Sequence, residues 1–152
     1  MQQVVEKLIF LQKTISTMES CTGGYIASSI TNIPGASKVF PFGAVTYATE
    51  SKIKMGVPKE MMETFGVYSI ETSKAMAKEI TKLTGTAFGI GITGRLQKED
   101  SKDAKVYISI YEKSEDKYES FTLEMKQTER AEEKQFIETK IEEKLLEMLE
   151  KY

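Results

Sequence analysis

Short β-prone runs alternate with amphipathic stretches along this chain, and the alternation limits the folds that it can adopt. In the amphipathic stretches, apolar residues recur at helical spacing. Interleaved helices and strands are typical of a sheet covered by helices on both faces. The sequence therefore predicts an α/β fold: a three-layer α/β/α sandwich around a mixed, mostly parallel sheet, ending in a hairpin and a helix. We expect helices at 2–13, 25–33, 50–56, after Pro58, from Ser69 to Gly85 and through Ile137, Ile141, Leu145 and Leu149, and strands at 14–18, 39–48, 86–93, 105–111 and 118–125.

The helix after Ser69 has recognisable signals at both ends. Ser69 is a favourable N-cap, and Gly85 is typical of a helix C-terminus. Within this helix we expect Ala77, Ile80 and Leu83 to form one buried face.

Three strands carry further signals. In "VFPFGAVTYA", Pro41 and Gly43 predict a bulge or an edge strand. The glycines of "TAFGIGIT" suit close approach of a neighbouring element. The turn formers of "EKSEDK" separate two alternating runs, which predicts an antiparallel hairpin.

The composition describes one ordinary globular domain, 1–152, and excludes several classes of function. A formal net charge of -2 argues against a general nucleic-acid binder. The apolar runs are shorter than the roughly 20 residues that a membrane span needs. A single cysteine and the lack of a secretory leader lead us to expect a cytoplasmic protein. The chain has no histidine, which excludes Ser-His-Asp and Cys-His hydrolases and histidine-ligated zinc sites.

The stretch "STMESCTGGYI" places polar side chains where a predicted strand meets a predicted helix. Ser20, Cys21 and Thr22 lie at the carboxyl end of the strand, which is where ligands bind in open α/β sheets. We expect free N–H groups at the helix start to attract an anion or to stabilise an oxyanion. The turn is also consistent with a purely structural role, because Ser and Thr are common helix caps and Gly23–Gly24 is an ordinary turn.

Two further polar clusters follow predicted strands. "VTYATESK" contains Tyr47 and Lys52, which can accept a proton from a serine if burial or a nearby positive charge lowers their pKa values from about 10. Thr93 and Gly94 in "GITGR" also lie at the end of a strand. The alternatives are that Lys52 is a solvated helix lysine, Tyr47 a half-buried strand residue and Thr93 a polar cap.

These motifs together resemble the C-terminal domain of the competence-damage protein CinA, whose stand-alone members are nicotinamide mononucleotide deamidases. "ESCTGGYIASSITNIPGASKVFPFGAVTYATESKIKMGV" (19–57) resembles that family almost position by position, and "YSIETSKAMAKEI" and "GIGITG" follow in the right order. The resemblance covers most of the chain and weakens after Gly94. It implies an amidohydrolase that converts nicotinamide mononucleotide and water to nicotinic acid mononucleotide and ammonia in pyridine nucleotide salvage.

The resemblance also implies roles for individual residues. It makes Ser20 the nucleophile, activated by Tyr47 and Lys52. We expect Cys21 to point inward as a small apolar residue. No cofactor and no metal are implied; the expected partners are a small nucleotide substrate and further copies of the chain, with no nucleic acid and no membrane. The substrate-binding residues implied are Cys21, Thr22, Gly23, Gly24, Thr46, Thr93, Gly94 and Arg95.

The chain departs from the family pattern in three places. In "TYATESK", Thr49 and Ser51 stand where the family has asparagine and alanine. The family's glycine-rich loop after "TG" is replaced by the charged loop 95–104, and its "GDR" by "TERAEEKQF", where Arg130 or Lys134 can substitute for the arginine. In the loop, Arg95, Lys98 or Lys102 can hold a phosphate by charge, whereas Glu99, Asp100 and Asp103 oppose an anionic ligand.

These departures leave three functions open. The first is an active amidohydrolase acting on nicotinamide mononucleotide or a related carboxamide. The second is a catalytically impaired relative that binds a nucleotide or a protein partner. The third is an interaction module that uses the exposed strand edge of "VFPFGAV".

Overall fold

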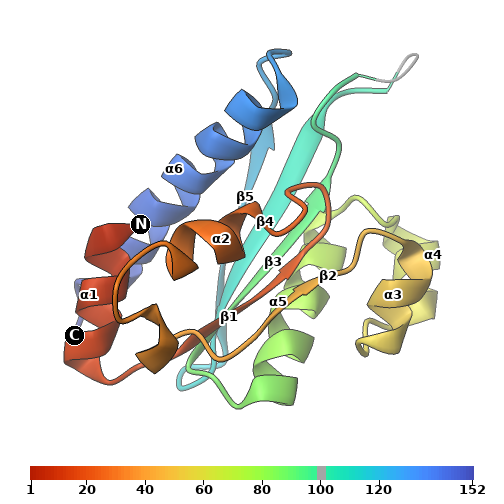
Figure 1. The fold of residues 1–152 in the computed structure, drawn as a ribbon. Coiled ribbons are helices and arrows are strands. Elements are labelled where there is room, and N and C mark those ends of the chain that lie inside the picture. Colours follow the sequence, from red (N-terminus) through yellow and green to blue (C-terminus); the bar gives the residue numbers. More distant parts are fainter. Residues whose placement is uncertain (99–101) are drawn as a thin grey trace.

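A five-stranded sheet forms the centre of the protein in a computed structural model that describes residues 1–98 and 102–152. The strand order is β2-β1-β3-β4-β5 (Figure 1). The strands are β1 (Ile15–Glu19), β2 (Gly43–Val45), β3 (Phe88–Gly94), β4 (Lys105–Glu112) and β5 (Lys117–Glu124).

The sheet is mixed, as the sequence predicts. β1 pairs in parallel with β2 and β3, whereas β4 pairs antiparallel with both β3 and β5. Parallel and antiparallel pairings are therefore equal in number, because the hairpin of β4 and β5 adds two antiparallel partners. The short β2 lies at one edge, as expected from Gly43 and from Pro41, which precedes the strand. The register places Glu19 beside both Val45 and Ile92, so the carboxyl ends of the three parallel strands meet at one edge of the sheet.

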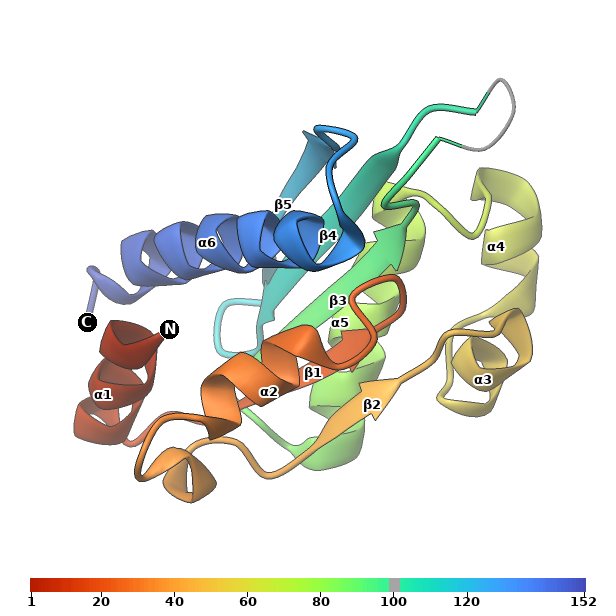
Figure 2. The same ribbon diagram turned by 45° about the horizontal axis from the view of Figure 1, so that its top comes forward.

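Helices cover both faces of this sheet and complete the three-layer sandwich (Figures 1 and 2). One face carries α1, α2 and α6, and the other carries α5 with α3 and α4 beside it. The helices are α1 (Gln2–Leu11), α2 (Tyr25–Thr31), α3 (Thr49–Lys54), α4 (Lys59–Phe65), α5 (Ile70–Thr84) and α6 (Arg130–Leu149), with a short 3₁₀ turn at Ala36–Lys38.

The larger core lies between the sheet and the α1, α2 and α6 layer. The expected apolar residues of α6 are fully buried in this core, which confirms the prediction from their spacing. A smaller core on the opposite face is built from Met18, Val57, Met62, Met76 and Ile80. The two cores together hold the sheet from both sides.

The ends of α5 lie where the sequence predicts them. The Ser69 hydroxyl accepts a hydrogen bond from Thr72 N at 3.1 Å, and Gly85 ends the helix in the left-handed conformation with φ 72°. The expected buried face is wrong at Leu83, which is 62% exposed. The physical reason is that α5 faces the sheet with smaller side chains, among them Ser73 and Ala77, and this turns Leu83 toward solvent.

Small residues face the sheet because α5 lies very close to β3. A Cβ atom at Gly91 would lie 2.6 Å from Ala77 N and closer still to the carbonyl oxygen of Ser73. A Cβ atom at Gly89 would collide with Thr81 Oγ1 and Ala77 O. The close approach expected from the glycines of this strand is therefore confirmed, and α5 is its partner.

Candidate active site

Ser20 and Lys52 are brought together by the parallel pairing of β1 and β2. Ser20 follows β1 directly, and Thr46 follows β2, with Thr46 N donating to Glu19 O at 2.8 Å. α3 then begins at Thr49, and Lys52 on this helix reaches Ser20 at the end of β1. Two segments far apart in the chain thereby meet at the carboxyl edge of the sheet.

The contact between these two side chains is direct. Lys52 Nζ lies 3.0 Å from Ser20 Oγ and 2.5 Å from the carbonyl oxygen of Thr46. Lys52 is 1% exposed and Ser20 4% exposed. Lys52 is therefore not a solvated helix lysine, and its long side chain ends beside a hydroxyl that it can deprotonate.

Burial sets the proton affinity of Lys52. Desolvation lowers the pKa of its ammonium group from the ordinary value of 10.5. A Cys21 thiolate would oppose this shift, but burial raises the pKa of that thiol to about 12, so the thiol is neutral at pH 7. A lysine with a lowered pKa supplies more of the neutral amine, which is the form that accepts a proton.

Cys21 lies inside the protein, as expected. Its side chain is 7% exposed and belongs to the larger core. Burial is the largest cause of its raised pKa, and the charge of Glu19 adds to it. The thiol is therefore a weak nucleophile in the folded protein, although it neighbours Ser20.

This environment predicts slow alkylation of Cys21. At pH 8 we expect iodoacetamide to modify the folded protein about a hundredfold more slowly than the protein unfolded in guanidinium chloride. Because the chain has one cysteine, intact-mass spectrometry reports this side chain alone. Equal rates in the folded and unfolded protein would contradict the burial of the thiol.

Tyr47 is not brought to the Ser20–Lys52 pair. Its side chain is 66% exposed on the surface beyond β2. Among the described residues, the contacts to Lys52 Nζ come from Ser20 and Thr46. The activating role that the resemblance implies for Tyr47 stays a prediction, and no hydrogen bond among the described residues joins Tyr47 to Ser20.

Three threonines expected to bind substrate use their hydroxyl groups inside the protein. Thr22 Oγ1 donates to Glu19 Oε2 at 2.6 Å, and Thr93 Oγ1 donates to the Val67 carbonyl at 3.0 Å. Thr46 Oγ1 donates to the carbonyl oxygen of Glu19 at 3.5 Å, and the Thr46 carbonyl accepts from Lys52 Nζ. All three threonines are buried, so their hydroxyl groups stabilise the site through hydrogen bonds inside the protein.

The expected glycines and arginine surround the same edge of the sheet. Gly23 and Gly24 both have positive φ angles, of 62° and 93°, which a turn of this shape requires. Gly94 lies against the backbone of β4, where a side chain would collide with Lys105 O. Arg95 stacks its guanidinium on the ring of Tyr68, with 4.3 Å from Cζ to the ring centroid.

The sequence reasoning missed the role of Glu19. We expected free N–H groups at the start of α2, but the Glu19 carboxylate accepts hydrogen bonds from them. That expectation is wrong, because the acid at the end of β1 reaches over the turn and caps the helix. The available signal in the sequence was an acidic residue, Glu19, between the predicted strand and the Gly23–Gly24 turn that precedes the helix.

Lys134 is the C-terminal cation that lies near the turn. Its Nζ is 3.5 Å from the position that a Cβ on Gly23 would occupy, and its charge lowers the pKa of Cys21 slightly against the larger effect of burial. Arg130, the alternative, is exposed at the start of α6. Lys134 therefore lies close to the Gly23 turn, and its role in place of the family's arginine stays a prediction.

The charged loop 95–104 is described in part. Glu99 and Asp100, which we expected to oppose an anionic ligand, lie outside the described residues. Exposed side chains are found at Lys98, Lys102 and Asp103.

Residues 1–98 and 102–152 present neither a metal-binding cluster of side chains nor a membrane-spanning helix. That part of the chain contains no group of three or more histidine, cysteine, aspartate or glutamate side chains placed to hold a metal ion. None of its helices combines the length and the apolar character that crossing a membrane requires.

Comparison with known families agrees with this architecture. The sequence profile described as the CinA C-terminal domain matches residues 1–152. The chain belongs to the CinA C-terminal domain family. A competence-damage inducible protein of Clostridium perfringens is 52% identical over 96 residues, which are 62% of this chain and 23% of that protein. A CinA-like protein of Kosmotoga olearia is 52% identical over 82 residues, 53% of this chain and 20% of its own length. The chain thus matches about a quarter of these longer CinA relatives.

Solved CinA structures share the fold over nearly the whole chain. A CinA superfamily protein of Klebsiella pneumoniae superposes with a TM-score of 0.91 at 22% identity, covering 99% of this chain and 96% of the other. The competence/damage inducible protein CihA of Agrobacterium tumefaciens has a TM-score of 0.85 at 27% identity, covering 98% and 94%. The sandwich is therefore the CinA fold.

Proposed function

We propose that this chain is an amidohydrolase that converts nicotinamide mononucleotide and water to nicotinic acid mononucleotide and ammonia. The observation that carries the proposal is the buried contact of 3.0 Å between Lys52 Nζ and Ser20 Oγ. A serine beside a desolvated lysine is a nucleophile with its own base, which a protein without histidine needs. Membership of the CinA family supports the reaction, and the motifs 19–57, 68–80 and 89–94 support the substrate.

The first half of the reaction forms an acyl-enzyme. Ser20 Oγ attacks the carboxamide carbon, and its proton moves to the neutral amine of Lys52. The carbonyl π-electrons move to oxygen and give a tetrahedral oxyanion. When the C–N bond breaks, the Lys52 ammonium gives its proton to the departing nitrogen, which leaves as ammonia.

Backbone donors are available for the oxyanion. Ser20 N bonds to Ile92 O and Gly23 N to Ser20 O, while the N–H groups of Gly24, Ile26 and Ala27 bond to Glu19. Among the described residues, no backbone or side-chain oxygen accepts a hydrogen bond from the N–H groups of Cys21 and Thr22. We assign these two donors to the oxyanion, next to the nucleophile that generates it.

The second half restores the enzyme. A water molecule gives its proton to Lys52 and attacks the ester carbon. The C–O bond to Ser20 then breaks, and Lys52 returns the proton to Ser20 Oγ. The carboxylic acid so formed gives its own proton to solvent and leaves as a carboxylate. Lys52 thus acts as base and acid in turn, while its bond to the Thr46 carbonyl keeps Nζ in place.

The substrate's phosphate needs a cation near the turn. The N–H groups at the start of α2 do not bind the phosphate in this proposal, because they donate to the Glu19 carboxylate. Lys134, whose Nζ lies beside Gly23, is the cation that we assign to this phosphate.

The proposal is tested by ammonia release from nicotinamide mononucleotide. We expect the wild-type protein to turn over and Ser20→Ala to lose about a thousandfold or more in rate, because the nucleophile is gone. Ser28→Ala is the matched control: it removes an exposed hydroxyl from α2, and we expect it to keep wild-type activity.

Two results would overturn the proposal. Activity that survives Ser20→Ala but is lost in Cys21→Ala would move the nucleophile to the thiol. Binding of nicotinamide mononucleotide by the wild-type protein without any ammonia release would favour the second candidate, a nucleotide-binding relative with an impaired site.

A further inference from the structure

Glu19 is a fully buried carboxylate at the end of β1, next to the nucleophile. Its oxygens accept four hydrogen bonds: from Thr22 Oγ1 at 2.6 Å, Gly24 N at 3.1 Å, Ile26 N at 3.1 Å and Ala27 N at 2.8 Å. Bonds from N–H and O–H donors to a charged acceptor are stronger than bonds between neutral groups. The negative charge also lies at the start of α2, where the helix dipole favours it.

These bonds hold the turn that carries Ser20. The strand side of the turn is fixed by Ser20 N, which donates to Ile92 O at 3.0 Å. The helix side is fixed by the Glu19 carboxylate through Thr22 and Gly24. Ser20 Oγ lies between these two attachments, so its distance to Lys52 depends on both.

We propose that Glu19 is a positioning residue that holds the Ser20 turn in its reactive geometry; this inference rests on the proposed function. Its carboxylate accepts hydrogen bonds from the N–H groups of Gly24, Ile26 and Ala27. The N–H groups of Cys21 and Thr22 remain available to the oxyanion. Glu19 touches neither the substrate nor the reacting atoms. It acts through the turn, because a small displacement of a nucleophile lowers the rate strongly.

Glu19→Gln changes this arrangement with little change in shape. The amide keeps one acceptor oxygen, but its NH₂ group must then face a backbone N–H, either that of Ala27 or those of Gly24 and Ile26. The variant therefore loosens the turn on its helix side.

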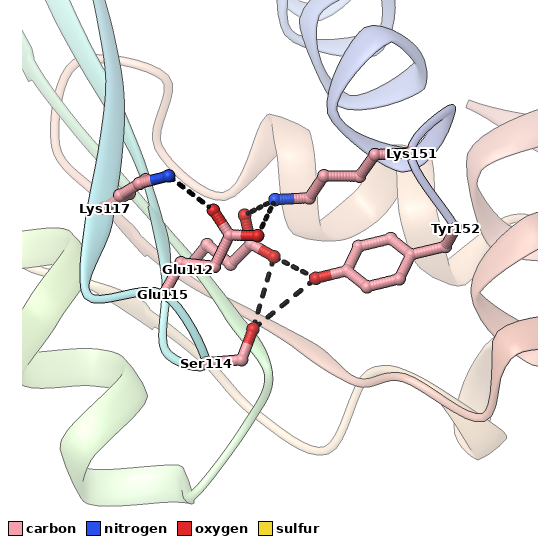
Figure 3. Close-up of polar contacts among 6 residues, drawn as sticks. All are labelled: Glu112, Ser114, Glu115, Lys117, Lys151 and Tyr152. Carbon is pink, nitrogen blue, oxygen red and sulfur yellow. Dashed lines mark hydrogen bonds and ion pairs between the residues drawn. The ribbon is translucent and has the colours of Figure 1, made fainter.

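A matched control lies at the opposite end of the sheet. Glu112 is 2% exposed and pairs with Phe88, at the start of β3. Its carboxylate accepts hydrogen bonds from Lys151 and Tyr152 (Figure 3). Glu112→Gln removes an equally buried negative charge without touching the Ser20 turn.

The experiment measures the reactivity of Ser20 with and without the substrate. A small fluorophosphonate reports the nucleophile directly: a bond forms from Ser20 Oγ to phosphorus, fluoride leaves, and the serine proton goes to Lys52. Its rate is followed by intact-mass spectrometry in wild type, Glu19→Gln and Glu112→Gln, beside kcat and KM for nicotinamide mononucleotide and the unfolding midpoint in urea.

We expect Glu19→Gln to slow labelling and kcat by about tenfold to a hundredfold, with KM changed less than kcat. Glu112→Gln should label at the wild-type rate, even if its unfolding midpoint in urea falls as far as that of Glu19→Gln. Labelling of Glu19→Gln at the wild-type rate would overturn the positioning role alone. Glu19-dependent labelling without ammonia release would refute the proposed function and leave the positioning role standing, whereas a wild-type protein without any labelling at Ser20 would overturn both.

Discussion

Lys52→Met is expected to lower the rate of ammonia release by about a hundredfold to ten-thousandfold, the range that general acid–base catalysis contributes. Methionine fills a similar volume but cannot accept the proton of Ser20, which lies 3.0 Å from the lysine nitrogen. In the wild type we also expect the rate to rise with pH through the lowered pKa of Lys52, because the ammonium form has no lone pair. The pH–rate profile of wild type beside the single-turnover rate of the variant measures both effects.

At pH 7, we expect the Lys52→Met variant to be at least as stable as the wild type. Burial lowers the pKa of Lys52 in the folded state, so between that pKa and the ordinary value of 10.5 the unfolded chain binds more protons than the folded one. The free energy of unfolding of the wild type therefore rises with pH across this window, and the cost of burying the charge is largest below it. Lys52→Met carries no such cost, so its advantage should shrink as the pH approaches 10.5.

Urea unfolding of both proteins at pH 7 and pH 10 tests this dependence. Lys54→Met is the control, because Lys54 lies on the same helix with an exposed side chain. It should keep activity and show no change with pH relative to wild type. A stability difference between Lys52→Met and wild type that is the same at both pH values would contradict the desolvation of Lys52.

The order of helices and strands could be predicted because local signals agree with the fold. The Ser69 cap, the Gly85 end and the apolar spacing of α6 each depend on nearby residues only. Leu83 was placed wrongly because the buried face of α5 is decided by the strand that it packs on. The glycines of β3 let the backbone of α5 approach the strand very closely. The face of α5 that packs on the sheet is therefore made of small residues and not of the largest apolar ones.

The candidate site could be predicted in its residue types but not in its contacts. Ser20 and Lys52 meet only because β1 and β2 pair in parallel with Glu19 beside Val45, and no local pattern encodes that register. The role of Glu19 was missed for a related reason. Its four hydrogen bonds depend on how the turn folds back over the strand end, whereas the sequence shows only an acid before two glycines.

Gly91→Ala is expected to destabilise the protein by about 3 kcal/mol or more, which is the severe end of overpacking in a core. The added Cβ would lie 2.6 Å from Ala77 N and would also collide with Ser73 O, and both atoms belong to the backbone of α5. A backbone cannot change rotamer, so the whole helix must move away from β3. The same helix packs on β1 and β4, so the displacement spreads through that face of the sheet.

Gly85→Ala separates this effect from the general cost of replacing a glycine. Gly85 has φ 72° and nothing within 4 Å of an added Cβ, so alanine there costs only the left-handed conformation, about 1 kcal/mol. Urea unfolding followed by circular dichroism compares the two variants with wild type. Equal losses at the two positions would mean that α5 can retreat from β3 at little cost. A clearly larger loss in Gly91→Ala than in Gly85→Ala would show that glycine is required at this position of β3, because contact between strand and helix backbone leaves no room for a side chain.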